Sequence, residues 1–286
     1  MKTFRIGGVH PAENKLSAGS PIREAALPKQ AIFSMFQHIG APAKPVVKKG
    51  DVVKVGTMIA EAGGFVSAPV HSSVSGTVSK VDVVIDASGT RRQAIFVDVN
   101  GDGWEDAIDR SPELVRLSDR PELDAATIIN KVKEAGIVGL GGATFPCHVK
   151  LSPPPGSKAE CVIINAVECE PYLTADHRLM LEHPEEILVG VSLIMKAVSV
   201  EKGYIGIENN KPDAIRLMTE KAQAYPNIEI VPLKVKYPQG GEKQLIAAVL
   251  GKEVRSGALP VTTGAVVNNV ATVYTIFEAV YNDRPL

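Results

Sequence analysis

A glycine-rich segment followed by a lysine is the strongest chemical signal in this sequence. The segment reads G-I-V-G-L-G-G-A-T-F-P over residues 136–146, and Lys150 follows it. Glycine lacks a Cβ atom, so this backbone can approach a ligand closely and turn its amide groups towards it. The segment has no G-K-[ST] ending and follows an expected helix, so it matches neither a triphosphate-binding loop nor the Rossmann fingerprint. Alone, it indicates either a ligand-binding loop or a tight structural turn.

Three later segments concentrate acidic and amide side chains in short blocks. They read N-A-V-E-C-E-P over residues 165–171, Y-P-Q-G-G-E over 237–242 and N-N-V-A-T over 268–272. Glu168 and Glu170 would share one face of a strand, and Cys169 would then point the other way, into packing. These acids either contact a ligand or are solvated. Asn268 and Asn269 either contact a ligand or cap the final helix.

Alternating strand and helix patterns predict an α/β domain over residues 124–286, with a mainly parallel, Rossmann-like sheet. Helices are expected from Asp124 to Gly136, from His183 onward, from Pro212 towards Ala224 and from Glu242 to Leu250. Short strands are expected at residues 161–164, 203–207 and 228–231. Such a layer can position the four segments at its edges.

The first hundred residues show a different pattern. Residues 1–40 are expected to be irregular, residues 45–99 contain short β-rich runs separated by turns, and residues 101–123 form a connection. The runs at 46–56 and 68–81 resemble the barrel-sandwich fold of biotinyl and lipoyl carriers. Those carriers present a modified lysine on a hairpin, whereas residues 61–65 contain none. We therefore expect an all-β unit over residues 1–100 without the carrier function, the alternative being an unrelated small β unit.

The four blocks together resemble a known family. The string G-x-G-G-A-x-F-P is similar to the cofactor loop of the NADH-binding flavoprotein subunit of respiratory complex I and of the RnfC family, the C subunits of Rnf electron transport complexes. The blocks at 165–171, 237–242 and 268–272 are similar to further segments of these proteins, in the same order. The opening G-G-V-H-P-A-E-N-K at residues 7–15, with the β unit, resembles the RnfC family instead of complex I. The resemblance covers the whole chain.

The resemblance implies a noncovalently bound FMN that exchanges hydride with NAD(H). It implies that the two cofactors lie against Gly139, Gly141, Gly142 and Ala143, that adenine stacks on Phe145, and that the FMN phosphate meets Lys150. It implies that Asn165, Glu168 and Glu170 line the isoalloxazine and nicotinamide region, and that the flavin pocket is completed by Tyr237, Gly240, Glu242, Asn268 and Asn269. The cofactors carry the chemistry, so no catalytic side chain is expected.

Two positions depart from the complex I pattern, which has acids where this chain has Val167 and Gly241. Loss of an acid from a flavin edge alters the local field, which affects flavin affinity or potential. The alternative function is therefore a flavin-less scaffold that docks membrane partners of a respiratory complex. A carrier or interaction module built on the β unit is disfavoured by the missing lysine.

The resemblance also implies an enzyme complex, an ion-translocating ferredoxin:NAD oxidoreductase. The expected partners are NAD(H), ferredoxin-linked electron-transfer subunits and other membrane subunits, and the expected location is peripheral, on the cytoplasmic face of the membrane. Family members continue into a further small domain and a C-x-x-C-x-x-C region. We therefore expect a truncated subunit whose 4Fe-4S clusters lie outside this chain, and which alone is not fully active.

Composition excludes several other classes. The net charge of −1 gives no basis for nucleic-acid binding. The start has no apolar signal core, and the longest apolar run, residues 187–195, is too short to span a membrane. The three cysteines form no C-x-x-C pair, which favours a reducing compartment. His148 and His177 are isolated, so no metal site is expected.

Overall fold

The computed structural model describes residues 1–111, 113–115, 117–154 and 156–286, and the chain divides into two compact units. The first unit contains residues 1–23, 114–126 and 151–277, and the second contains residues 24–113, 127–150 and 278–286. Helices α1 (Ala125–Glu134) and α7 (Val270–Tyr281) have residues in both units. The units are interleaved along the chain, and the domain limits at residues 100 and 124 stay a prediction.

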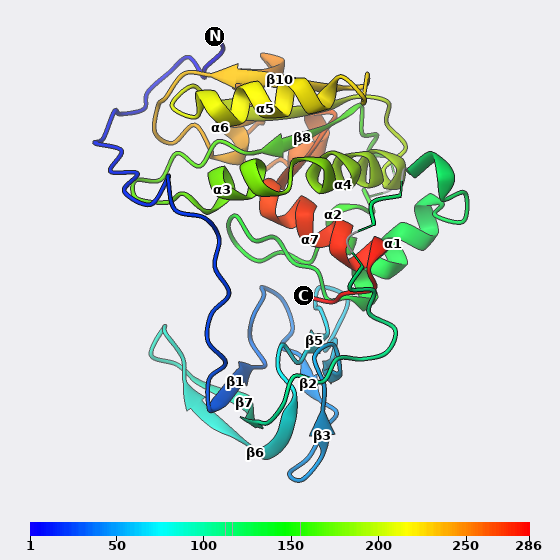
Figure 1. Cartoon of the computed structure of the whole chain (residues 1–286). Helices are drawn as coiled ribbons and strands as arrows, with labels where there is room; N and C mark the ends of the chain where they lie inside the picture. The colour runs from blue at the N-terminus through cyan, green and yellow to red at the C-terminus, as the bar shows by residue number, and fades with distance from the viewer. Residues whose placement is uncertain (112, 116, 155) are drawn as a thin grey trace. The chain divides into compact units, whose positions relative to one another are not determined.

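The first unit is built on a parallel four-stranded sheet in the order β10-β9-β8-β11. Its strands β8 and β10 are labelled in Figure 1. Its strands are β8 (Cys161–Asn165), β9 (Gly203–Glu208), β10 (Ile228–Leu233) and β11 (Ala265–Asn269). All four are rich in β-branched and buried residues, as expected for a parallel sheet covered on both faces. The predicted Rossmann-like α/β fold is therefore confirmed.

Helices cover both faces of this sheet (Figure 1). One layer contains α3 (Ala175–Glu182), α4 (Pro184–Ala197) and α5 (Pro212–Ala222), and Gly190 of α4 lets the backbone of α7 approach closely at Val273. Helix α6 (Glu242–Leu250) packs on the other face, where Leu245 joins Cys161 and Ile163 of β8 in one apolar cluster. Two short 3-10 helices, Leu117–Asp119 and Pro260–Thr263, complete this unit.

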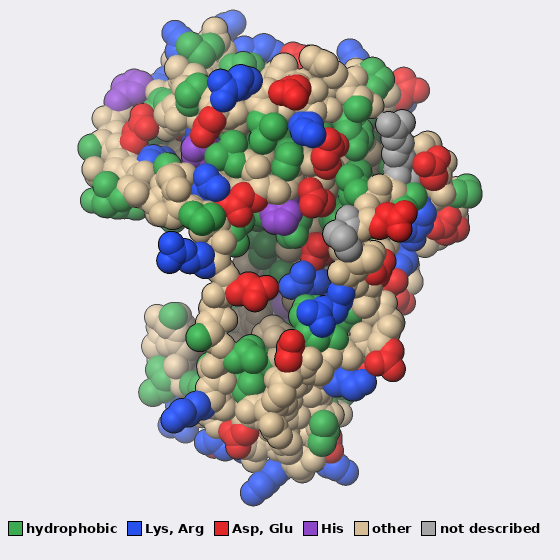
Figure 2. Space-filling view, viewed as in Figure 1, with side chains coloured by type: hydrophobic (Ala, Val, Ile, Leu, Met, Phe, Trp, Pro, Cys, Tyr) green, Lys and Arg blue, Asp and Glu red, His purple; other side chains and the backbone are tan. Residues whose placement is uncertain are grey.

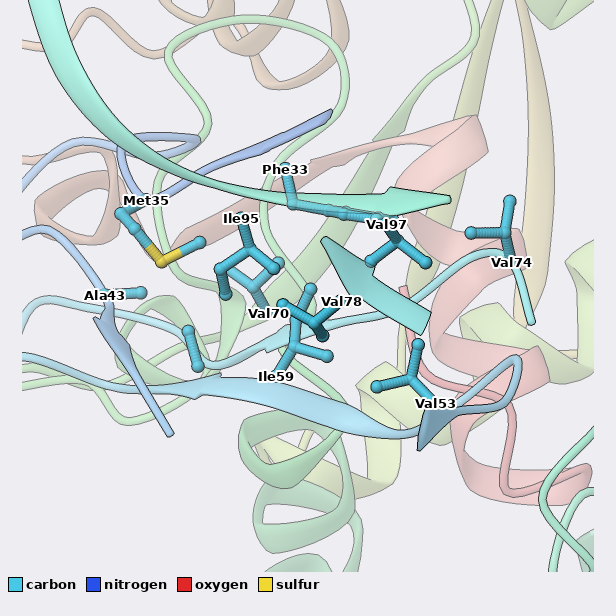
Figure 3. Packing of buried hydrophobic residues seen from close by; sticks show 11 residues of the cluster. Phe33, Met35, Ala43, Val53, Ile59, Val70, Val74, Val78, Ile95 and Val97 are labelled. Atoms are coloured by element: carbon cyan, nitrogen blue, oxygen red, sulfur yellow. The ribbon is translucent and has the colours of Figure 1, made fainter. Parts of the chain in front are cut away.

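The second unit consists mainly of two small antiparallel sheets, ordered β1-β7-β6-β3 and β2-β4-β5. Their strands are β1 (Gln30–Ser34), β2 (Lys44–Pro45), β3 (Val52–Val53), β4 (Met58–Glu61), β5 (Val70–His71), β6 (Gly76–Ile85) and β7 (Arg91–Val99). Ile59, Val78 and Ile95 from different strands meet in one buried cluster with Phe33 and Met35 (Figure 3). The unit also holds most of α1 and the short helix α2 (Cys147–Lys150). The predicted all-β barrel-sandwich unit is confirmed.

Several elements differ from the sequence-based expectations. The region 1–40, expected to be irregular, contains β1, which pairs with the distant strand β7. Helix α3 and strand β11 were not predicted. Residues 166–170 follow β8 as a loop, so the expectation that Glu168 and Glu170 share a strand face is wrong.

Charged side chains of both signs are interspersed on the face drawn in Figure 2, in line with the net charge of −1. Among the described residues, no helix is long and apolar enough to cross a membrane. The same residues contain no group of three or more His, Cys, Asp or Glu side chains arranged to hold a metal ion.

Candidate functional site

The candidate site in the first unit lies at a topological switch point. The chain runs from β8 to β9 and β10 on one side and returns to β11 on the other side of β8. In parallel α/β sheets, ligands bind in the crevice outside the carboxyl ends of strands that diverge in this way. Asn165 ends β8, Asn269 ends β11, and the two residues are register partners. Two of the predicted site residues therefore stand side by side where such a fold binds its ligand.

Asn165 joins two of the predicted blocks. Its side-chain nitrogen donates a hydrogen bond to the carbonyl oxygen of Gly240 at 2.7 Å. The amide of Gly240 donates to Cys169 Sγ at 3.3 Å, and a Cβ atom on residue 240 would lie 3.1 Å from that sulfur. A side chain at residue 240 would therefore crowd the sulfur of Cys169. Cys169 also packs against the apolar cluster beneath, as predicted for its side chain.

Tyr237 and Glu170 form a second link between the same two blocks. The charge of Glu170 and its hydrogen bond to the phenol raise the pKa of Tyr237. The backbone of Tyr237 pairs in both directions with Val9 at 2.8 Å, and the Tyr237–Pro238 peptide is cis. Glu242 begins α6, directly after Gly241 at the N-cap position. The 237–242 block is therefore held by contacts to both Val9 and the 165–171 block.

Asn269 both caps a helix and binds a partly buried acid. Its side-chain oxygen accepts hydrogen bonds from the amides of Ala271 and Thr272 at 2.9 and 3.3 Å, at the start of α7. Its side-chain nitrogen donates to Asp176 Oδ2 at 2.7 Å. The capping role weighed from the sequence is thus present at Asn269. Its neighbour Asn268 is 4% exposed, and Nδ2 of Asn268 has no hydrogen-bond partner among the described residues.

Glu168 stabilises the start of α3. Its carboxylate accepts hydrogen bonds from the amides of Asp176 at 2.7 Å and of His177 at 3.3 Å. Burial, and next the charge of Glu168, raise the pKa of Asp176 to about 6, whereas Asn269, Lys211 and Lys15 act in the opposite direction. This edge of the sheet therefore holds several acids close to two ammonium groups.

The glycine loop belongs to the second unit. Gly136 has a φ of +70°, and a Cβ there would lie 2.4 Å from the carbonyl oxygen of Pro69, so glycine is required. The loop is closed by a hydrogen bond of 2.9 Å from the Gly139 amide to the Phe145 carbonyl. Its tip, residues 140–143, is exposed, and no atom would meet a Cβ on Gly142 within 4 Å. Gly141, Gly142 and Ala143 therefore lie where a ligand can reach them.

The remaining predicted residues of this loop flank its tip. Phe145 is half-buried and immediately precedes the bridge at Pro146, and Lys150 is half-buried at the carboxyl end of α2. Cys147, between them, is buried, which raises the pKa of its thiol to about 12. A thiol of this kind is a packing residue at neutral pH, not a reactive one.

Three residues that lie at this edge of the parallel sheet were not predicted to have roles there. They are Lys15, Lys211 and Asp176, all of which contact the predicted blocks or the groups around them. The sequence contained a signal only for Lys15, which lies in the quoted G-G-V-H-P-A-E-N-K opening. Val167, one of the two departures from the complex I pattern, is completely buried in the core cluster of α6 and the sheet.

Two family models match this chain. The Nuo51 FMN-binding domain matches residues 132–278, just over half of the chain, and the RnfC barrel sandwich hybrid domain matches residues 2–102. Both matches agree with the two folds described above.

Curated relatives match almost the entire chain. The C subunit of the Na⁺-translocating ferredoxin:NAD⁺ oxidoreductase complex of Acetobacterium woodii is 48% identical over 99% of this chain and 63% of its own length. The corresponding subunit of the proton-translocating complex of Clostridium ljungdahlii is 46% identical, over 100% of this chain and 61% of its own length. The chain thus spans somewhat over three-fifths of the length of these relatives.

Solved structures support the α/β fold. An NAD⁺-reducing [NiFe]-hydrogenase in its H₂-reduced state is 28% identical, with a TM-score of 0.50, and the match covers 57% of this chain and 32% of the hydrogenase chain. The air-oxidized state of the same kind of enzyme gives 29% identity and the same TM-score.

Proposed function

Because this chain belongs to the RnfC family and carries the Nuo51 FMN-binding domain, we propose that it binds FMN and NAD(H) and passes electrons between them within a membrane-associated oxidoreductase complex. The observation that carries the proposal is the convergence of three motif blocks, 165–171, 237–242 and 268–272, at the switch point of the parallel sheet. That place is the usual ligand site of such sheets.

The residues present fit a flavin. Asn268 offers a buried side-chain donor without a partner among the described residues, and a buried donor requires an acceptor. The edge of the isoalloxazine ring presents oxygen and nitrogen acceptors of this kind. The exposed tip of the glycine loop leaves room for close backbone approach, and Lys150 would hold the FMN phosphate as a point charge.

Protein residues act by binding and orientation in this proposal. The bound flavin would supply the capacity to accept and release hydride equivalents. Asn165, Glu168, Glu170, Tyr237, Gly240, Glu242, Asn268 and Asn269 would line the ring region, and Phe145 would stack on the adenine of NAD(H). The hydrogen bonds from Asn165 to Gly240 and from Gly240 to Cys169 would keep two of the lining loops at a fixed separation.

The wider role follows from the relatives, whose names describe ion-translocating ferredoxin:NAD⁺ oxidoreductase complexes. We extend to this chain the partners NAD(H), ferredoxin-linked electron-transfer subunits and other subunits of the complex, together with a peripheral position on the cytoplasmic side of the membrane. The 4Fe-4S clusters would lie in a part of the subunit outside this chain.

The alternative of a flavin-less scaffold rested on Val167 and Gly241. Val167 is completely buried among Cys161, Ile163 and their neighbours, so its side chain is part of the core. At Gly241, an added Cβ would meet Oε1 of Gln244 at 2.5 Å. Neither observation removes a contact made by the proposed lining residues, and the FMN titration below decides between the two functions.

The proposal is tested by mixing FMN-loaded protein with NADH under anaerobic conditions. We expect the flavin absorbance to bleach, and Asn268→Ala to weaken FMN binding through loss of the buried donor. The matched control is Asn227→Ala, which makes the same chemical change at an exposed position before β10. No FMN binding by the wild-type chain would favour the scaffold. Bound FMN that NADH does not reduce would contradict the proposed electron transfer.

A further inference from the structure

The ammonium group of Lys15 binds three backbone carbonyl groups of one loop. Lys15 Nζ donates to the carbonyl oxygen of Glu168 at 2.8 Å, of Glu170 at 2.8 Å and of Leu173 at 2.7 Å. These contacts use all three N–H donors of an ammonium group. The loop that they hold, residues 168–173, contains both acids of the N-A-V-E-C-E-P block.

This loop has a backbone that needs external support. Glu168 and Tyr172 have positive φ angles of 48° and 68°, which residues with side chains rarely adopt. Such conformations persist where the surroundings determine them from several sides. A second lysine, Lys211, is completely enclosed and donates to the carbonyl of the preceding residue, Val167, at 2.8 Å. Two ammonium groups thus fix four carbonyls between residues 167 and 173.

The N-terminal segment brings Lys15 to this position. The Tyr172 amide donates to the Glu13 carbonyl at 2.9 Å, and the hydroxyls of Ser17 and Thr174 share a hydrogen bond of 2.7 Å. Residues 13–17 therefore run along the loop on both sides of Lys15. Residues 1–23 belong to the same compact unit as the parallel sheet.

We propose that Lys15 is a positioning residue that holds the 168–173 loop in the conformation that presents Glu168 and Glu170 to the cofactors. The consequence for cofactors rests on the proposed function, whereas the conformational role of Lys15 does not. The three acceptors surround a compact ammonium group, whereas the planar fork of an arginine presents its donors in one plane. The N-terminal segment is thereby part of the cofactor site.

Hydrogen exchange of the cofactor-free chain tests the conformational role directly. The amide of Tyr172 lies in this loop and donates to the Glu13 carbonyl, and the amides of Asp176 and His177 donate to the carboxylate of Glu168 in the loop. We expect Lys15→Met to speed exchange of these amides by about tenfold or more, because charge-assisted contacts are lost, while amides of β9 keep their wild-type rates. The matched control is Lys202→Met, an exposed lysine before β9.

Chemical rescue gives an independent readout. Lys15→Ala should regain slow exchange at residues 172–177 in n-propylammonium, which restores three N–H donors, but not in tetramethylammonium at equal ionic strength. Unchanged exchange in Lys15→Met, or a rise that is equal in the loop and in β9, would overturn the inference.

FMN titration separates the role of Lys15 from the proposed function. If the wild-type chain binds FMN, Lys15→Met should weaken FMN by about tenfold, and Lys202→Met should leave it unchanged. If the wild-type chain binds no FMN, the proposed function fails, and the exchange experiment still decides the role of Lys15. If Lys15→Met speeds exchange in the loop but binds FMN with wild-type affinity, the proposed link between the loop and the cofactors is overturned.

Discussion

The side-chain nitrogen of Asn165 donates a hydrogen bond of 2.7 Å to the carbonyl oxygen of Gly240. This bond joins the end of strand β8 to a loop that follows β10, across 75 residues of sequence. Because Gly240 in turn donates to Cys169, one amide side chain aligns two of the motif blocks. The geometry of the candidate site therefore depends on Asn165 even if its side chain never touches a ligand.

We expect Asn165→Leu to weaken FMN binding. The substitution keeps the approximate size of the side chain but leaves the Gly240 carbonyl without its donor. Such a loss costs about 1–3 kcal/mol, which corresponds to roughly five- to a hundredfold in affinity if it falls on the bound state. Fluorescence titration with FMN measures the effect, after circular dichroism has shown a folded variant. Unchanged affinity in a folded protein would mean that the two loops are aligned by other contacts.

The phosphate role of Lys150 predicts discrimination between FMN and riboflavin. Lys150→Met should weaken FMN by about ten- to a hundredfold, since a charge-assisted contact contributes roughly 1.5–3 kcal/mol. Riboflavin lacks the phosphate, so its weaker binding should not change. Lys49→Met, at an exposed position of the second unit, is the matched control. Equal affinities of the wild-type chain for FMN and riboflavin would refute this placement.

A substitution of Phe145 should affect the binding of NADH but not the binding of FMN. If its half-buried ring stacks on adenine, Phe145→Ala should reduce NADH binding by about 0.5–1.5 kcal/mol and leave FMN affinity nearly unchanged. Calorimetric titrations with each ligand, together with a melting curve, provide the measurement. A joint loss of both affinities with earlier melting would show that Phe145 is a packing residue.

The raised pKa of Asp176 predicts that the free energy of unfolding depends on pH. Its pKa is raised from 3.8 to about 6 in the folded protein, mainly by burial and next by Glu168. Between about pH 4 and pH 6 the folded state keeps a proton that the unfolded chain has lost, so the free energy of unfolding falls as pH rises through this window. Above pH 6 this group destabilises the fold by about 3 kcal/mol.

Asp176→Asn tests this sign. The amide oxygen can still accept the hydrogen bond from Asn269, while the cost of the buried charge disappears. Urea unfolding should show the variant more stable than wild type by about 1–3 kcal/mol near pH 7.5, with the difference vanishing near pH 4. A difference that stays constant over this range would contradict the assignment.

Local patterns predicted most of the parallel-sheet unit. Helix α6 was predicted with its observed bounds, and β9 and β10 within two residues. Strand β1 was not predicted from the sequence, because it pairs with β7, which lies far away along the chain. Helix α3 was not predicted, and its first amides are capped by Glu168, from outside the helix. The side chain of Thr174 at the N-cap position donates or accepts no capping hydrogen bond to α3 and bonds to Ser17 instead.

The sequence predicted which residues come together at this edge of the sheet better than it predicted the contacts among them, and their role in ligand binding stays a prediction. The motif blocks named Asn165, Glu168 and Gly240, which lie at one edge of the sheet. The sequence could not show that the carboxylate of Glu168 caps α3, or that Lys15 holds the loop. Both contacts join residues far apart in the chain through side chain and backbone, and neither leaves a periodic pattern.

The most direct test of the proposed flavin site is an FMN titration of the purified chain, followed by flavin fluorescence. We predict saturable binding with one FMN per chain, much weaker binding of riboflavin, and a marked loss of FMN affinity in Asn268→Ala but not in Asn227→Ala. Fluorescence of FMN that stays at the free-ligand value in an excess of folded protein would contradict the proposal that this chain is a flavoprotein.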